Sequence, residues 1–75
     1  MIRFKLKELI AEKEYKDKKR LSIKQISEAT GIGRTTLSKI VNQKAVNTTL
    51  ENIDKLCQLF DCKIQDLVIY EKSED

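Results

Sequence analysis

The residue types that most often catalyse reactions or bind metals are scarce in this sequence. Its 75 residues contain no histidine, and only Cys57 and Cys62 are cysteines. Histidine is the commonest general base, and a structural zinc site takes four Cys or His ligands. Glu28 and Asp66 have no base or nucleophile near them in sequence. We therefore expect no enzyme, no metal and no cofactor, and we interpret the cysteines as small core hydrophobes.

The chemistry that remains is hydrogen bonding and ion pairing by basic and hydroxyl side chains. Residues 1–45 hold twelve Lys and Arg against five Asp and Glu, a net charge of +7, whereas residues 46–75 hold three against seven, a net charge of −4. A basic front and an acidic back indicate a surface that meets a polyanion. On charge alone, an ordinary solvated surface is an equal alternative. The positions of the charged residues on the helices distinguish the two.

Four of these twelve cations, Lys24, Arg34, Lys39 and Lys44, lie in or just after a pair of short helices joined by Gly31-Ile32-Gly33. Ser22, with Gln25 three residues on, predicts a capping box that opens the first helix, and Gly31 is the residue type that ends one. Ile32 is expected to be buried and to hold the turn against the core. Two short helices around a glycine turn are the helix-turn-helix pattern, about residues 22–41.

The second helix of this pattern, residues 34–41, presents an unusual outward face. Leu37 and Ile40 point inward by their spacing, while Thr35 and Thr36 are mediocre helix formers with nothing apolar to cover them. Arg34 is a cation at a helix start, where it opposes the helix dipole. A guanidinium can donate two hydrogen bonds to guanine, and threonine offers a hydroxyl and a methyl group to other bases. A helix held with its N-terminus forward fits a major groove about 12 Å wide.

The rest of the chain predicts three more helices. One runs to about Glu14 and is followed by a charged loop over residues 15–20, whose cations Lys18, Lys19 and Arg20 are taken as solvated rather than phosphate-bound. Another covers residues 50–60, opened by a capping box over residues 48–51 and with Leu50 inward, and a short one covers residues 64–68. Residues 71–75 are expected to be a frayed tail, and the first few residues to be either a strand or an arm. With no proline and two glycines, the composition favours helices in one small domain, residues 1–75.

Two segments carry a family resemblance. Leu6-Lys7-Glu8-Leu9 together with Ser22-Ile23-Lys24-Gln25-Ile26-Ser27-Glu28-Ala29-Thr30-Gly31-Ile32-Gly33-Arg34-Thr35-Thr36-Leu37-Ser38-Lys39-Ile40 resembles the Cro/phage-repressor (XRE-type) helix-turn-helix family, and residues 49–68 are similar to its fourth and fifth helices. The resemblance implies an all-α fold, a five-helix repressor-like DNA-binding domain with a central helix-turn-helix. The sequence departs from the family's usual pattern at the long loop 15–20, at Ile23, at Gly33 in place of a capping serine, and at Val41 and Gln43 in place of Glu and Gly.

The same resemblance assigns roles to the polar residues. It implies that the helix 34–41 enters the major groove of double-stranded DNA and contacts bases through Arg34, Thr35, Thr36 and Lys39. Ser38 is a candidate for a contact to either a base or the DNA backbone. The expected contacts to the DNA backbone come from the N-terminus of the helix that Ser22 opens, where free amides suit a phosphate, and from positions within and just past the recognition helix. These backbone residues are Ser22, Lys24, Gln25, Ser38, Asn42 and Lys44; for Ser22 simple capping is an equal alternative, and for Ser38 an indifferent surface position.

The resulting interpretation is a transcriptional regulator that binds specific duplex DNA in the cytoplasm. Recognition of two half-sites about one helical turn apart implies a homodimer. Self-association is expected in the acidic C-terminal third, through Ile64, Val68, Ile69 and Tyr70. With no apolar run long enough to span a bilayer and no secretory signal, no membrane association is expected. The alternative is an antitoxin-like protein of the same fold that mainly holds an unidentified protein partner. A third possibility is an interaction module without DNA binding. Against this third possibility speak five polar residues on one predicted surface: Arg34, Thr35, Thr36, Lys39 and Lys44.

Overall fold

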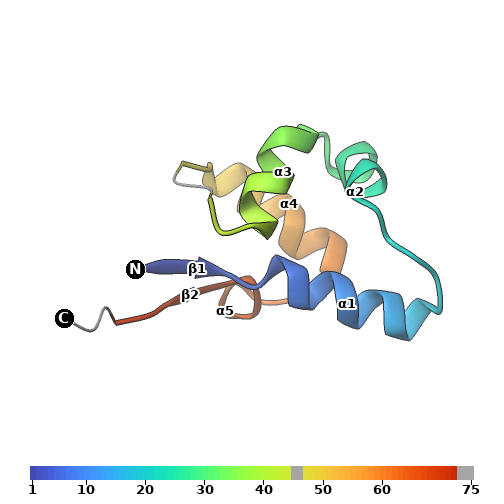
Figure 1. The fold of residues 1–75 in the computed structure, drawn as a ribbon, viewed down its shortest axis with the longest axis horizontal. Helices are drawn as coiled ribbons and strands as arrows, with labels where there is room; N and C mark the ends of the chain where they lie inside the picture. The colour runs from blue at the N-terminus through green and yellow to red at the C-terminus, as the bar shows by residue number, and fades with distance from the viewer. Residues whose placement is uncertain (45–46, 73–75) are drawn as a thin grey trace.

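A computed structural model describes residues 1–44 and 47–72, and in these residues it contains five helices and two short strands (Figure 1). α2 and α3 lie on the upper side of the molecule in Figure 1, α1 and α5 on the lower side, and the two strands project together at one end. The all-α, five-helix expectation is confirmed, with a small strand pair added to it. In chain order the elements are β1 (Ile2–Phe4), α1 (Leu6–Asp17), α2 (Ile23–Thr30), α3 (Arg34–Val41), α4 (Leu50–Phe60), α5 (Ile64–Leu67) and β2 (Val68–Tyr70).

One apolar core holds the helices together. α1 to α4 each contribute apolar residues spaced three or four apart, so that the buried stripe of each helix faces the others, and the four-residue α5 contributes Leu67. Burying one such Leu or Ile side chain stabilises the fold by about 1.5–3 kcal/mol. Cys57 and Cys62 are free thiols, half-buried and packed against the core, as predicted. The buried apolar residues are Phe4, Leu6, Ile26, Ile32, Leu37, Ile40, Ile53, Leu56 and Leu67.

The first helix is longer than the sequence suggested. We expected α1 to end near Glu14, but it continues to Asp17, and Lys18 then leaves it in a left-handed conformation with φ 54°. Ion pairs one turn apart support the added turn: Lys13 lies 3.1 Å from Asp17, and Lys16 pairs with Glu12. Dense charge is compatible with a helix when opposite signs alternate at this spacing. The connecting loop is correspondingly shorter.

The start of α4 also differs from expectation. The cap is Thr49 rather than Thr48: its hydroxyl accepts a hydrogen bond from the Asn52 backbone N–H at 3.1 Å. Thr48 instead accepts a bond from the Asn52 side chain. Leu50, predicted to point inward, is 82% exposed. It lies on the apolar stripe but in the first turn, where none of the described residues covers it.

The two strands form an antiparallel ribbon between the beginning and the end of the chain. Ile2 pairs with Tyr70, and Phe4 with Val68. This decides between strand and arm for the first residues, and it places Val68 in a strand rather than in the last helix. The N–H of Glu71 donates to the Met1 carbonyl at 2.8 Å, so Glu71, expected in the frayed tail, is bonded to the ribbon. Positions 73–75 of that tail lie outside the described residues, and so does position 45, the last residue of the polar link that the sequence predicts over residues 42–45.

Candidate nucleic-acid interface

The N-terminus of α2 is closed by the predicted capping box. The Ser22 hydroxyl accepts a hydrogen bond from the Gln25 backbone N–H at 3.2 Å, and the Gln25 side-chain oxygen accepts one from the Ser22 backbone N–H at 2.8 Å. The side-chain NH2 of Gln25 is therefore its remaining hydrogen-bonding group. Ser22, Lys24 and Gln25 are all exposed. This helix end thus presents donors and partial positive charge to solvent, the conditions that suit a phosphate.

The turn between α2 and α3 is fixed by backbone and hydroxyl hydrogen bonds. Gly31 has φ 78°, a conformation that glycine adopts at little cost, and its N–H donates to the Ser27 carbonyl at 2.7 Å. The Ser27 hydroxyl donates to the Ile32 carbonyl at 2.6 Å. Ile32 itself is 4% exposed, as expected. The direction of α3 is therefore set by a turn with few free torsions.

Thr30 is a residue of this turn that sequence reasoning missed. Its hydroxyl donates to the Ile26 carbonyl at 2.7 Å and accepts from the Ile32 N–H at 3.2 Å. It is also the buried polar residue of the described core, with 9% exposure. The available signal was a hydroxyl directly before the helix-ending Gly31 and four residues after Ile26, the spacing at which a side chain reaches back to a helix carbonyl.

α3 presents one polar face to solvent. Leu37 and Ile40 are wholly buried, so residues on the opposite side of the helix point outward. Of the predicted base-contacting residues, Arg34, Thr35 and Lys39 are exposed, and Thr36 is half-buried at the flank. Four residues at i, i+3, i+4 and i+7 share the outermost face: Thr35, Ser38, Lys39 and Asn42.

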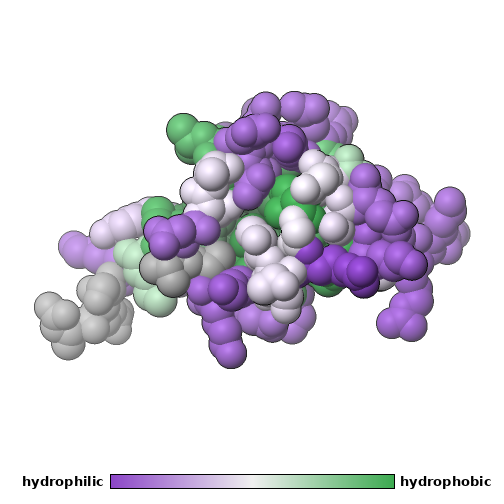
Figure 2. Space-filling view, turned by 90° about the horizontal axis from the view of Figure 1, so that it is seen from above, coloured by the Kyte–Doolittle hydropathy of each residue, from purple (hydrophilic) through white to green (hydrophobic). Residues whose placement is uncertain are grey.

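α2 and α3 lie next to one another on the upper side of the molecule (Figure 1). Figure 2 looks onto that side from above, and the surface over α2 and α3 is mainly hydrophilic or of intermediate hydropathy. Five ion pairs join side chains of the described residues, and they involve the ribbon, α1 and α4. Within those residues, Lys24, Arg34, Lys39 and Lys44 take part in no ion pair. Their charges are available to an external anion.

α3 ends in a tight cap rather than a frayed turn. The N–H of Lys44 donates to the Lys39 carbonyl at 2.7 Å, and the N–H of Gln43 donates to the Ile40 carbonyl at 3.2 Å. This is the Schellman arrangement, with Gln43 in the left-handed position at φ 61°. Asn42 and Lys44 are exposed on either side of it. At the other end, Gly33 opens α3 without a side-chain cap.

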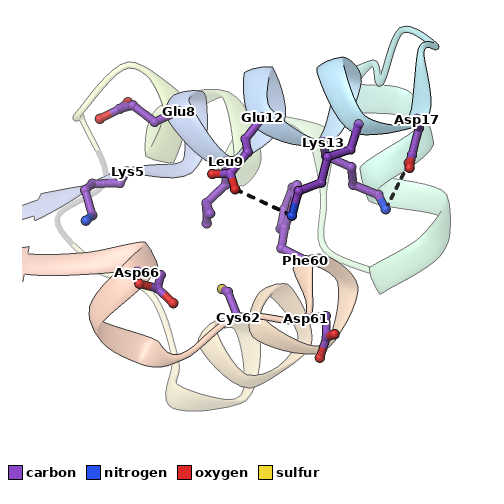
Figure 3. Close-up of a pocket in the computed structure, with 11 residues that line it drawn as sticks. Lys5, Glu8, Leu9, Glu12, Lys13, Asp17, Phe60, Asp61, Cys62 and Asp66 are labelled. Carbon is purple, nitrogen blue, oxygen red and sulfur yellow. Dashed lines mark ion pairs between the residues drawn. The ribbon is translucent and has the colours of Figure 1, made fainter.

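A pocket elsewhere on the molecule does not include any predicted site residue. It has a volume of about 460 Å³ and lies between α1 and the turn after α4, where Leu9, Phe60 and Cys62 face it (Figure 3). Burial raises the pKa of the Cys62 thiol to about 11, and the neighbouring Cys57 thiol, Asp66 and Asp61 add to the effect. Such a thiol is a poor nucleophile near neutral pH. In the described part of the chain, no helix is both long and apolar enough to cross a membrane.

Comparison with known proteins agrees with this geometry. A family model described as the Cro/C1-type HTH DNA-binding domain matches residues 5–73. The "uncharacterized HTH-type transcriptional regulator YozG" of Bacillus subtilis (strain 168) is 31% identical over 58 residues, which span 77% of this chain and 69% of that protein. These matches do not favour the antitoxin-like alternative. The chain belongs to the Cro/C1-type helix-turn-helix family of DNA-binding domains and is a DNA-binding transcriptional regulator.

Proposed function

We propose that the chain acts as one sequence-specific domain that places α3 in the major groove of duplex DNA. The observation that carries this proposal is the outward polar face of α3, a helix packed against α2, which holds cations that take part in no ion pair among the described residues. An exposed helix of this kind can reach base edges while its neighbour contacts the backbone.

Bases are read by the first turns of α3. Arg34 supplies a bidentate donor that suits guanine, Thr35 a hydroxyl and a methyl group, and Lys39 a further donor. Thr36, half-buried at the flank, contributes its side chain at the edge of the same contact. A good bidentate contact discriminates against a wrong base by about 1–3 kcal/mol.

Contacts to the DNA backbone come from two places that flank this reading face. Ser22, Lys24 and Gln25 at the start of α2 form one group, and Asn42 and Lys44 after α3 form the other, with Ser38 between them. The two lysines neutralise phosphates, each adding about 0.9 to the log–log dependence of affinity on salt. A dimer that uses both lysines in each subunit gains a slope of about 3.6 from them.

We further propose that two copies pair through the C-terminal part of the chain. Ile64 and Tyr70 are 55% and 74% exposed, and Val68 and Ile69 are half-buried beside them. Bonds of the ribbon join Met1 with Glu71 and Lys5 with Leu67, so by alternation the backbone groups of Tyr70 face away from β1. Those groups are available to a strand of a second copy. Light scattering that finds only monomer, alone at high concentration and on DNA, would refute this part.

The decisive experiment for the function is selection of bound sequences from random duplex DNA at two salt concentrations. We expect one enriched site with two-fold symmetry, and weaker binding at the higher salt. A bound pool that stays random at both concentrations would contradict sequence-specific recognition. The cytoplasm is the proposed place of action, and the free thiols of Cys57 and Cys62 fit a reducing compartment.

A further inference from the structure

Gln43 occupies a backbone conformation for which its residue type is poorly suited. It follows α3 with φ 61°, the left-handed position of the helix-ending motif, where glycine is usual because it has no Cβ. A glutamine at this position needs compensation from elsewhere in the structure. The hydrogen bonds of the Gln43 side chain supply this compensation.

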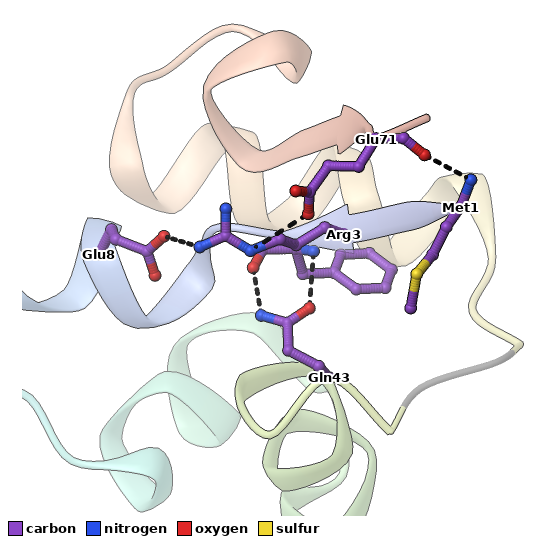
Figure 4. A network of polar contacts seen from close by, with 6 residues as sticks. Met1, Arg3, Glu8, Gln43 and Glu71 are labelled. Atoms are coloured by element: carbon purple, nitrogen blue, oxygen red, sulfur yellow. Dashed lines mark hydrogen bonds and ion pairs between the residues drawn. The ribbon is translucent and has the colours of Figure 1, made fainter. Parts of the chain in front are cut away.

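The Gln43 side chain binds both backbone groups of one residue in β1. The N–H of Phe4 donates to Gln43 Oε1 at 2.9 Å, and Gln43 Nε2 donates to the Phe4 carbonyl oxygen (Figure 4). Phe4 lies 39 positions earlier in the chain, and its side chain is 6% exposed. Its N–H and C=O face away from β2, because it pairs with Val68 between the hydrogen-bonded pairs of the ribbon. The side-chain amide of Gln43 therefore bonds to this free edge of β1 in the way that a peptide group of a neighbouring strand would.

The strand that Gln43 holds is itself anchored. Arg3 lies 3.1 Å from Glu8 of α1 and 3.6 Å from Glu71, which follows β2, and the N-terminal amino group donates to the Glu71 carbonyl at 2.8 Å (Figure 4). Phe4 adds the core contact. The clamp, defined as the two hydrogen bonds between Gln43 and Phe4, thus joins the end of α3 to a fixed part of the molecule.

We infer that Gln43 is a positioning residue for DNA binding, which acts through the side chains on either side of it. This inference rests on the proposed function, because Asn42 and Lys44 are the proposed backbone contacts. The clamp fixes the direction in which the chain leaves α3 and so presents Lys44 to a phosphate. A residue that served only as a helix cap would be replaced by glycine without loss, since glycine suits the conformation better.

The test compares Gln43→Gly with the wild-type chain on a selected duplex and on a random duplex. Glycine keeps the helix cap and removes the clamp. We expect affinity for both duplexes to fall by up to about eightfold per subunit at 0.1 M salt, the counterion term of one phosphate contact, and the salt slope to fall by up to about 0.9 per subunit. The ratio of specific to non-specific affinity should not change, because α3 itself is intact.

Two further variants guard against a change in folding. Asp61→Gly is the matched control: Asp61 has φ 48° in the equivalent position after α4 and is exposed. It should leave DNA affinity within about twofold. Gln43→Asn keeps an amide and tolerates the left-handed conformation but is one methylene too short for the clamp. It should reproduce Gln43→Gly, and thermal unfolding of each variant establishes that it is folded.

Combining variants tests whether Gln43 affects DNA binding by positioning Lys44. Lys44→Ala should lower the salt slope by about 0.9 per subunit, and adding Gln43→Gly to it should change affinity less than twofold. The inference is overturned if Gln43→Gly binds like the wild type with the same slope, if Lys44→Ala has no effect, or if the two losses simply add. An unspecific wild type would instead refute the proposed function, and the random-duplex measurements would still test the clamp.

Discussion

The hydroxyl of Thr30 offers a sharp test of how the direction of the recognition helix is set. Thr30→Val replaces this hydroxyl by a methyl group of the same shape, so no cavity is created. The Ile32 N–H, which donates to the hydroxyl at 3.2 Å, then lies without a partner in a residue that is 4% exposed. Leaving a buried donor unpaired costs about 1–3 kcal/mol, and we expect the free energy of unfolding to fall by about 2 kcal/mol.

Urea unfolding followed by circular dichroism measures this change. Thr30→Ser is the control: it keeps the hydroxyl and loses one methyl group, so it should cost about 1 kcal/mol or less. Thr30→Val also removes a hydrogen bond that holds the turn between α2 and α3, so its DNA affinity should fall more than that of Thr30→Ser. If Thr30→Val is within 0.5 kcal/mol of the wild type, or costs less than Thr30→Ser, then the hydroxyl does not hold the turn.

Three further substitutions have defined outcomes. Gly33→Ser should raise the free energy of unfolding by about 0.5–1 kcal/mol, because φ is −62° and an added Cβ meets nothing within 4 Å; a loss in urea unfolding would refute this. The pKa of Cys62 is raised from 9.0 to about 11, so the folded state holds its proton more tightly. The stabilisation from this tightly held proton is complete below pH 9 and declines as pH rises towards 11. The free energy of unfolding of Cys62→Ala should therefore fall less than that of the wild type over that interval, which denaturation curves of both proteins at each pH would detect. Leu50→Lys should change the free energy of unfolding by less than about 0.5 kcal/mol, given that 82% of the residue is exposed; a larger loss would mean that Leu50 is covered.

The elements around the proposed site were predictable because their signals are local. Ser22 and Gln25 close a capping box within one helical turn, and Gly31 ends the helix through its own backbone freedom. The burial of Leu37 and Ile40 follows from their spacing along one helix. These short-range features fix the outward face of α3 without knowledge of the remaining fold.

The features that were missed depend on distant parts of the chain. β1 and β2 are three residues each and pair across opposite ends of the sequence, so the sequence left β1 open between a strand and an arm and did not indicate β2. The role of Gln43 appears only when Phe4 lies beside it. Leu50 fits the apolar period of α4 but is exposed. Periodicity identifies a face of a helix, whereas coverage of that face is decided by tertiary packing.

The central claim is that the first turn of α3 reads bases, and base discrimination by Arg34→Ala tests it most directly. Affinities of the wild type and the variant are measured on the selected duplex and on duplexes changed at one base pair at a time. We expect the variant to lose discrimination at one base pair of each half-site by about 1–3 kcal/mol, which is about 5- to 150-fold, and to keep it at the others. Equal discrimination by both proteins at every position would contradict the account.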